Sequence, residues 1–237
     1  MARNFLRQDN LNMQPVNIIE HFGKQADEYE TLMEKLVPDY RKHQSIINEI
    51  LPATNDAEIR VLDLGCGNGI LSGLVLNRYP KAELVGIDVT PNMLKAYDRK
   101  LEQFKERYEL ILGDYRFKSI GSNYDIILSG LTLHHLTWGE RRDLYKVLYG
   151  ALEPNGCLIS SDIIIDEEWT TREKQYIAWK EFMASKGEDA EFWYNKHIEK
   201  DFPVTLSDHF NWLADAGFKN SMCHWRHNNF AITSAEK

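Results

Sequence analysis

The sequence predicts an α/β protein whose sheet is mostly parallel and covered by helices on both faces. The segment Ile59–Ser72 runs from an apolar strand through three alternate glycines into a helical pattern. Such a strand–loop–helix unit is typical of α/β proteins that hold a nucleotide-like ligand. Further apolar runs at Leu84–Val89, Leu110–Leu112 and Tyr124–Ser129 alternate with helical periodicity. This alternation predicts a parallel sheet, in which the Tyr124–Ser129 strand is buried on both faces.

The glycine loop narrows the class of ligand. Gly65, Gly67 and Gly69 would let the backbone approach a ligand without a Cβ in the way, and the following helix offers unpaired N–H groups. The third glycine comes one residue too early for the dinucleotide pattern G-x-G-x-x-G, because Ile70 stands where that pattern needs glycine. No lysine follows as a P-loop would require. The spacing therefore argues against a dinucleotide site and against the phosphate site of a P-loop.

Two acidic residues follow the next two predicted strands. Asp88 ends the second apolar run, about 20 residues beyond the glycines, where a carboxylate can bond both hydroxyls of an adenosine ribose. Asp114 comes shortly after the third run, in Gly113–Tyr115. The carboxyl ends of parallel strands lie at one edge of the sheet, so both acids are expected near the glycine loop.

These motifs resemble those of a known enzyme family. Asp63–Gly69 matches the E/D-x-G-x-G-x-G motif of class I S-adenosylmethionine (SAM)-dependent methyltransferases, and Asp88 and Asp114 stand where that family has acids. The resemblance implies a Rossmann-like fold with a mostly parallel seven-stranded sheet, an antiparallel last strand and helices on both faces. It also implies SAM as cofactor, S-adenosylhomocysteine as product and methyl transfer as the reaction.

A narrower likeness extends over most of the chain. Val37–Tyr40, the loop after Tyr124–Ser129 and the last helix with its following strands resemble the family of tRNA wobble-uridine 5-oxyacetate modification, which includes carboxy-SAM synthase. The synthase holds its extra carboxylate with an arginine shortly before the last helix. Asn195–Lys200 contains no arginine, and Lys196 lacks the forked geometry of one. We therefore expect ordinary SAM, with a carboxy-SAM-related enzyme or a tRNA wobble-uridine methyltransferase as the alternative.

The likenesses imply a set of cofactor-binding residues in the N-terminal helices, in the glycine loop and at the strand ends. They are Tyr29, Tyr40, Asp63, Gly65, Cys66, Gly67, Asp88, Val89, Met93, Asp114, Tyr115, Ser129 and Gly130. Phe22–Tyr29 resembles a segment that many such enzymes lay over the cofactor. The alternative is that these first helices only pack on the edge of the sheet, and that Met93 is ordinary core.

Four regions are expected along the chain. Residues 1–54 form an N-terminal helical lid, 55–165 the SAM-binding Rossmann-like core, 166–204 a helical insertion after strand five, and 205–237 the last helix with an antiparallel strand pair. The insertion is expected to roof the acceptor site, although an ordinary helical pair packed on the core explains the same pattern.

Several local details can be predicted within these regions. Pro38 suits the first turn of a helix, and Leu152–Gly156 reads as a turn before strand five at Cys157–Ile165. Tyr176, Trp179 and Met183 share one helix face. The last helix is expected to span Leu206–Ala216, with Thr205 or Ser207 as its cap and Gly217 at its end. The closing strands are expected at 218–226 and 228–234.

Two adjacent histidines, His134 and His135, follow strand four and are the predicted catalytic residues. Imidazole titrates near neutral pH, so either ring could take a proton from an oxygen or nitrogen acceptor, less readily from carbon. The alternative is that they bond backbone or contact the cofactor. Other candidates for the base are Asp162, His209, His224, Arg226 and His227.

No metal is expected. A metal-assisted reaction would need Asp162, His134, His209 and His224 to converge, which requires the final hairpin to fold over strand five. A cofactor-binding but catalytically silent subunit is a further alternative.

Composition indicates the kind of partner and compartment. The formal net charge is −8 and the pI about 5.5, which argues against a broad nucleic-acid surface. An RNA acceptor is not favoured, because only Lys95–Lys105 and Arg226–His227 are notably basic. Three scattered cysteines, no secretory signal and no membrane-spanning run predict a cytoplasmic enzyme with a small-molecule acceptor. The acceptor's identity is not encoded in a motif, and a homodimer is left open.

Overall fold

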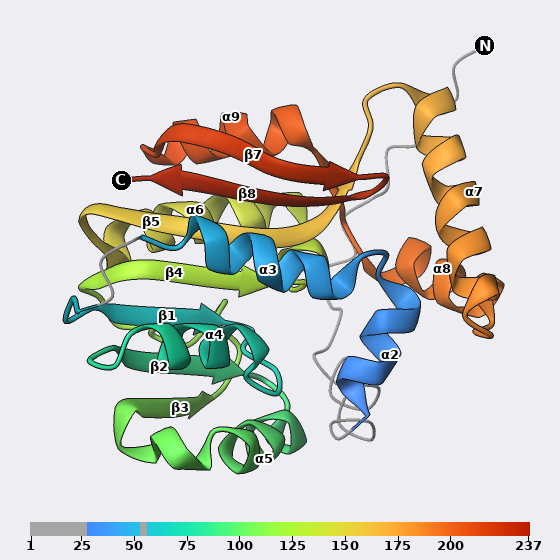
Figure 1. Ribbon diagram of the computed structural model, residues 1–237. Helices are drawn as coiled ribbons and strands as arrows, with labels where there is room; N and C mark the ends of the chain where they lie inside the picture. Colours follow the sequence, from blue (N-terminus) through green and yellow to red (C-terminus); the bar gives the residue numbers. More distant parts are fainter. Residues whose placement is uncertain (1–27, 53–55) are drawn as a thin grey trace.

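The computed structural model describes residues 28–52 and 56–237, and its centre is a sheet of eight strands within those residues. The strands are β1 (Arg60–Leu64), β2 (Glu83–Asp88), β3 (Tyr108–Leu112), β4 (Tyr124–Gly130), β5 (Leu152–Ile165), β6 (Val204–Thr205), β7 (Lys219–His227) and β8 (Phe230–Glu236). Their order is β3-β2-β1-β4-β5-β8-β7, and β6 pairs with the end of β5 (Figure 1).

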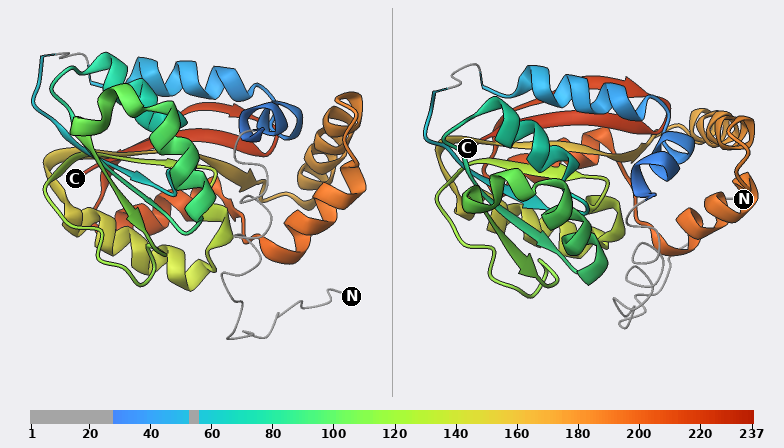
Figure 2. Two further views of the ribbon diagram at one scale, coloured as in Figure 1. Left: turned by 90° about the horizontal axis from the view of Figure 1, so that it is seen from below. Right: turned by 60° about the horizontal axis from the view of Figure 1, so that its bottom comes forward.

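Helices lie on both faces of the sheet and beyond the carboxyl ends of its parallel strands (Figures 1 and 2). The described helices are α2 (Tyr29–Leu36), α3 (Tyr40–Ile50), α4 (Ile70–Arg78), α5 (Pro91–Lys100), η1 (Glu102–Arg107), η2 (Leu133–His135), α6 (Trp138–Ala151), α7 (Trp169–Ser185), α8 (Ala190–Lys200) and α9 (Leu206–Ala216). Helices α3, α4 and α5 pack on one face, and α6 and α9 pack on the other. Strands that are apolar on both faces need helices to cover both faces of the sheet. This requirement explains why strands and helices alternate along the chain.

The central strands carry two apolar cores, one on each face. In β5, Leu158 belongs to the core under α6 and α9, whereas its neighbour Ile159 belongs to the core under α3, α4 and α5. This alternation follows from the period of two in a strand. Strands β1 to β5 pair in parallel, and β8 is antiparallel to both β5 and β7. The predicted fold class and its reversed last strand are confirmed.

Two boundaries predicted from the sequence are wrong. Residues 152–156, expected to form a turn, belong to β5, because Leu152 pairs with Tyr124 and a register irregularity beside that pair absorbs the extra residues. Asn155 does take the left-handed angle expected of it, at φ 66°. Pro38 lies before α3 and not in its first turn, because Asp39, at φ 58°, is the N-cap.

The other local predictions agree with the structure. Thr205 caps α9 by accepting from the Asp208 N–H at 3.0 Å, and Gly217 ends the helix at φ 108°. In α7, Trp179 and Met183 are buried in one cluster, with Tyr176 packed against it. Trp179 Nε1 donates to the Leu36 carbonyl at 2.6 Å, which ties α7 to α2.

Part of the predicted N-terminal region cannot be compared. Residues 1–27 and 53–55 are outside the described residues, and these include most of the Phe22–Tyr29 segment. Among the helices that are described, none has the length and apolar character that crossing a membrane requires.

Candidate active site

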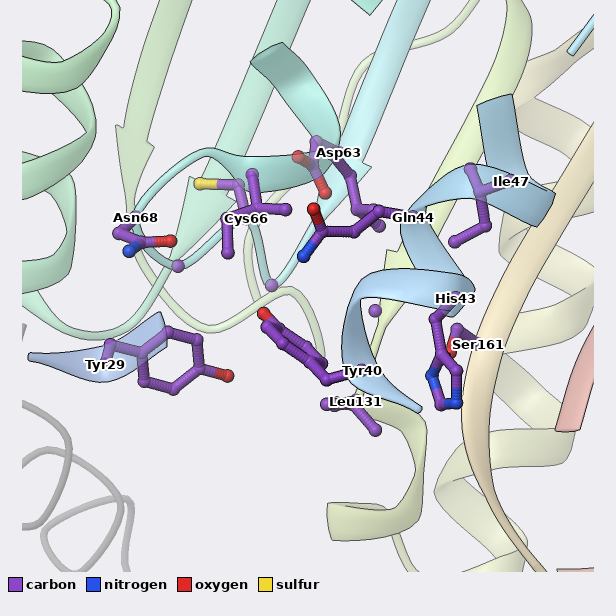
Figure 3. Close-up of a pocket in the computed structure, with 15 residues that line it drawn as sticks. Tyr29, Tyr40, His43, Gln44, Ile47, Asp63, Cys66, Asn68, Leu131 and Ser161 are labelled. Carbon is purple, nitrogen blue, oxygen red and sulfur yellow. The ribbon is translucent and has the colours of Figure 1, made fainter. Parts of the chain in front are cut away.

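A cavity opens at the carboxyl end of β1, between the glycine loop and helices α2 and α3 (Figure 3). We call its first side the glycine wall, formed by Asp63, Gly65, Cys66, Gly67, Asn68, Ile70 and Leu71. We call its second side the helical wall, formed by Tyr29, Tyr40, His43, Gln44, Ile47, Gly130, Leu131 and Ser161. Seven residues predicted to bind the cofactor therefore lie in the lining: Tyr29, Tyr40, Asp63, Gly65, Cys66, Gly67 and Gly130.

The glycine wall is shaped by left-handed backbone. Gly65, Gly67 and Gly69 have φ angles of 67°, 51° and 82°. A Cβ on Gly65 would lie 2.5 Å from the Thr132 hydroxyl oxygen, so no larger residue fits there. A Cβ on Gly67 would meet nothing within 4 Å, so the backbone at Gly67 borders open space. A ligand can approach the main chain at this point.

Asp63 braces the loop from beneath. Its Oδ2 accepts from the Ser72 N–H at 3.1 Å and from the Ser72 hydroxyl at 2.6 Å, which joins the end of β1 to the first turn of α4. Asp63 is almost completely buried, and burial raises its pKa to about 6 although the Ser72 hydrogen bonds oppose that shift. In this chain, Asp63, the acidic residue of the E/D-x-G-x-G-x-G motif, therefore has a structural role.

Asp88 lies at the end of β2, beside the glycine wall. One carboxylate oxygen accepts from the Gly67 N–H at 2.9 Å and the other from the Thr90 N–H at 2.7 Å. Burial raises the pKa of Asp88, against the effect of these hydrogen bonds. Val89 follows it at partial exposure, and Met93, the first turn of α5, packs against the Tyr29 ring. These predicted residues adjoin the cavity lining without belonging to it.

The helical wall contains polar residues that sequence reasoning missed. His43 and Gln44 lie one turn beyond Tyr40 on α3, on the same face as Ile47. The residues Tyr40, His43, Gln44 and Ile47 follow the spacing i, i+3, i+4, i+7. This spacing is the sequence pattern that could have indicated that His43 and Gln44 share the face of Tyr40. Figure 3 shows His43 beside Ser161, and the His43 Nδ1 lies 3.0 Å from the Ser161 hydroxyl. Burial lowers the pKa of His43 to about 4, so its ring is neutral at neutral pH.

His134 and His135, the predicted catalytic pair, are not in the cavity lining. They follow β4 in η2, and His134 is buried. Its Nδ1 is hydrogen-bonded to Asp162, whose other oxygen accepts from Arg141 at 3.2 Å. Burial and the neighbouring His135 lower the pKa of His134. The His135 Nδ1 lies 2.8 Å from Asp201, a residue that the sequence analysis did not single out.

Three more predicted cofactor residues lie away from the lining. Asp114 is in a forked ion pair with Arg116, at distances of 2.6 to 3.0 Å. Tyr115 lies beneath the loop that follows β4, where its hydroxyl donates to the Thr132 carbonyl at 3.2 Å. Ser129 is buried in β4, next to Gly130.

Of the metal set suggested by the sequence, Asp162 and His134 are in contact, whereas His209 and His224 bond other residues. His209 is buried between Tyr145 and Thr233, at 2.7 and 3.0 Å, and His224 bonds the Ser234 hydroxyl at 2.7 Å. The hairpin of β7 and β8 extends the sheet beside β5 and does not fold over it. Two other candidates for the base form ion pairs elsewhere. Arg226 pairs with Asp166, and His227 pairs with Asp39, both at 2.9 Å.

The residues around the cavity fit an adenosyl ligand. Open space borders Gly67, a carboxylate stands at the end of β2, and the apolar contact of Met93 with Tyr29 lies next to it. Nucleotide-like ligands in α/β folds bind at this edge of the sheet, over glycines and beside an acid. These residues are therefore of the kind that a SAM-binding site requires.

Comparison with known proteins agrees with this geometry. Residues 61–156 match the family model described as a methyltransferase domain. This segment runs from β1 into β5 and includes the whole glycine wall.

Two curated relatives differ in how much of the chain they cover. Carboxy-S-adenosyl-L-methionine synthase of Desulforapulum autotrophicum is 27% identical over 94% of this chain and 93% of its own length. Malonyl-[acyl-carrier protein] O-methyltransferase of Priestia megaterium is 30% identical over 60% of this chain and 49% of its own length. The chain thus spans about half of the second relative and nearly all of the first.

Solved structures share the fold. Human N-acetylserotonin methyltransferase in complex with SAM superimposes with a TM-score of 0.63 at 18% identity, over 93% of this chain and 57% of that one. At this identity the likeness shows the fold. Together with the methyltransferase domain model, the glycine motif and the curated relatives, it leads to one conclusion. The chain contains a methyltransferase domain, and its fold and its curated relatives are those of class I SAM-dependent methyltransferases.

Proposed function

We propose that this enzyme transfers a methyl group from SAM to an oxygen or nitrogen of a small-molecule acceptor. The observation that supports this proposal most is the cavity itself. It has a backbone-lined glycine wall on one side and the polar His43 and Ser161 on the other. A methyltransferase needs a cofactor on one side of the transferred group and an acceptor on the other, held in line.

In this proposal the glycine wall and its neighbours hold the cofactor. The main chain at Gly65 and Gly67 gives the close approach, Asp88 accepts from the ribose hydroxyls, and Met93 with Tyr29 covers the adenine side. Tyr40 and Gly130 flank the sulfonium end. SAM supplies an already activated methyl group, so the protein's task is placement of the acceptor and accommodation of its proton.

The helical segments then have separate roles. Residues 1–54 would act as a lid over the cofactor core of residues 55–165, and the insertion at 166–204 would roof the acceptor. Residues 205–237 would complete the core. The tie from Trp179 of α7 to the Leu36 carbonyl of α2 supports a roof and lid that are joined.

Acceptor contacts are proposed for His43 and Ser161. Both line the cavity, and the neutral His43 ring can bond an acceptor hydroxyl or amine. The assignment of the proton acceptor to His134 or His135 stays a prediction. Removal of His43 is expected to reduce turnover more than SAM affinity.

A second candidate function is suggested by a relative that aligns with nearly the whole chain. Carboxy-SAM synthase aligns over 94% of this sequence, so a reaction that forms or uses carboxylated SAM is the alternative. The absence of an arginine in Asn195–Lys200 favours ordinary SAM. Mass spectrometry of the nucleoside that copurifies with the protein separates the two, because the carboxylated cofactor is heavier by one carboxylate.

The test begins with calorimetric titration of SAM into the wild type and into Asp88→Ala. Wild type is expected to bind, and the variant to bind at least tenfold more weakly, since it loses two ribose hydrogen bonds of about 1.5 kcal/mol or more each. Small hydroxyl and amine acceptors are then screened by release of S-adenosylhomocysteine. His43→Phe is compared with His224→Phe, at a histidine on the outer hairpin that bonds Ser234. Failure of the wild type to bind SAM would refute the proposal.

A further inference from the structure

Three imidazoles surround one carboxylate where the segment after β4 meets the end of α8. Asp201, just after α8, has one oxygen 2.8 Å from the His135 Nδ1 and the other 2.8 Å from the His197 Nδ1. The second oxygen also lies 3.9 Å from the His134 Nε2. The His134 and His197 side chains are 7% and 3% exposed and that of Asp201 is 11% exposed, so the cluster is largely removed from water.

The His134 ring is oriented by a second carboxylate. Its Nδ1 is bonded to Asp162, and Asp162 is itself held by the buried Arg141. When the Nδ1–H of His134 donates a hydrogen bond to Asp162, the Nε2 of the same ring has the lone pair. This nitrogen faces Asp201. A histidine that donates one ring N–H to a carboxylate and presents its other nitrogen to a ligand is the arrangement seen behind metal-binding histidines.

Charge balance differs between the two carboxylates. Asp162 has the guanidinium of Arg141 as its counter-ion. Asp201 faces only histidines in the ion pairs found among the described residues. A largely buried carboxylate needs a compensating positive charge. A cation bound beside Asp201 would supply that charge.

The spacing of the ligand atoms suits a cation. One nitrogen or oxygen from each of His134, His135 and Asp201 lies within 4.8 Å of the others. The 3.9 Å between the His134 Nε2 and Asp201 is too long for a hydrogen bond. Two ligand atoms each about 2.0 Å from a tetrahedral ion lie about 3.3 Å apart, so the His134 Nε2 and Asp201 would move slightly closer on binding. The shorter His135 contact would open slightly as its hydrogen bond is replaced by coordination.

We propose that the His134 Nε2, the His135 Nδ1 and the Asp201 carboxylate form a binding site for a divalent transition-metal cation such as Zn²⁺. Imidazole and carboxylate are ligands that Zn²⁺ and its neighbours in the first transition row accept. Two other residues support the ligands without belonging to the set. Asp162 orients His134, and His197, fixed by the Tyr176 hydroxyl at 3.2 Å, orients Asp201. The ligand set shares only His134 with the one considered from the sequence.

The site joins two distant parts of the chain. His134 and His135 follow β4, four residues after the cavity-lining Gly130, whereas Asp201 ends the helical insertion. The Phe202 N–H also donates to the His134 carbonyl at 2.6 Å. A bound cation would therefore fix the insertion over the carboxyl end of the sheet. Three protein ligands also leave a fourth position for water or an acceptor oxygen.

The experiment measures metal binding without turnover, so its outcome does not depend on the proposed methyl transfer. Full-length protein is treated with chelator, dialysed and titrated with Zn²⁺ by calorimetry, and with Co²⁺ by its visible absorption spectrum. We expect one equivalent per chain and a rise in melting temperature, because the metal binds the folded site.

Variants assign the ligands. His135→Ala and Asp201→Asn are expected to weaken Zn²⁺ binding by at least ~100-fold, and Asp162→Asn by ~10-fold, as for a supporting residue. The control, His224→Ala, removes a histidine that bonds Ser234 on the outer hairpin and should keep wild-type affinity. Circular dichroism selects the variants that fold. His135, whose side chain is 20% exposed, is the ligand whose loss the fold should tolerate best.

Two results would overturn the proposal. One is a folded wild type that binds neither Zn²⁺ nor Co²⁺. The other is binding that His135→Ala and Asp201→Asn both retain at full strength. In either case the cluster is a hydrogen-bonded network that holds no metal.

Discussion

The two walls of the cavity are built in different ways. The glycine wall is a continuous segment whose shape comes from backbone angles and from bonds to Asp63 and Asp88. The helical wall gathers side chains from α2, α3, the loop after β4 and β5, which are far apart in the sequence. The first wall is therefore a property of local sequence, and the second depends on long-range packing. This difference implies that the two walls respond to different kinds of mutation.

Gly65→Ala should break the glycine wall with the largest effect. The residue has φ 67°, and the new Cβ would lie 2.5 Å from Thr132. We expect a loss of roughly 2–6 kcal/mol in unfolding free energy, from backbone strain and overpacking together. Urea denaturation measures the stability, and calorimetry should show little SAM binding by any folded fraction.

The matched control for this change is Gly150→Ala in α6. That glycine has no positive φ, and its Cβ would meet nothing within 4 Å. Alanine is favoured there by about 1 kcal/mol because glycine is a poor helix former. Equal effects of the two substitutions would show that the loop is not strained as described.

Acid should act on the two walls in opposite directions. His43 has a folded pKa of about 4, below its unfolded value, so its contribution to stability is lost as pH falls from about 6.5 to about 4. Asp63 has a folded pKa of about 6, above its unfolded value, so the cost of burying its charge is relieved over about the same range. Each effect is on the order of 3 kcal/mol at full extent.

Urea denaturation at about pH 7 and about pH 4.5 separates these contributions. His43→Gln is expected to flatten the loss of stability in acid, and Asp63→Asn to steepen it. Identical pH dependence in the wild type and both variants would contradict the assignment.

Trp179→Phe should loosen the helical wall with the smallest effect. It removes the bond from the Trp179 Nε1 to the Leu36 carbonyl, at the end of α2 and just before Tyr40. We expect a loss of about 1–2 kcal/mol, with turnover more affected than SAM binding. Trp169→Phe, at a side chain 68% exposed, serves as control and should change neither quantity.

The sequence by itself determined the fold class, the glycine loop, the end of α9 at Gly217 and the likeness to methyltransferases. Each rests on residues that are close together in the chain, where periodicity and backbone chemistry decide the conformation. Residues 152–156 show the limit of that approach, because a turn-like composition was overruled by pairing with Tyr124.

Only the tertiary structure decided which side chains meet across the cavity. The contact of His43 with Ser161, and the cluster of His134, His135 and Asp201, each join residues that no spacing rule relates. Side chains beyond the local strand–loop–helix unit are placed by packing of whole helices on the sheet, and this packing reflects the summed burial of both cores. The glycine wall was therefore predictable from the sequence, whereas the contact of His43 with Ser161 was not.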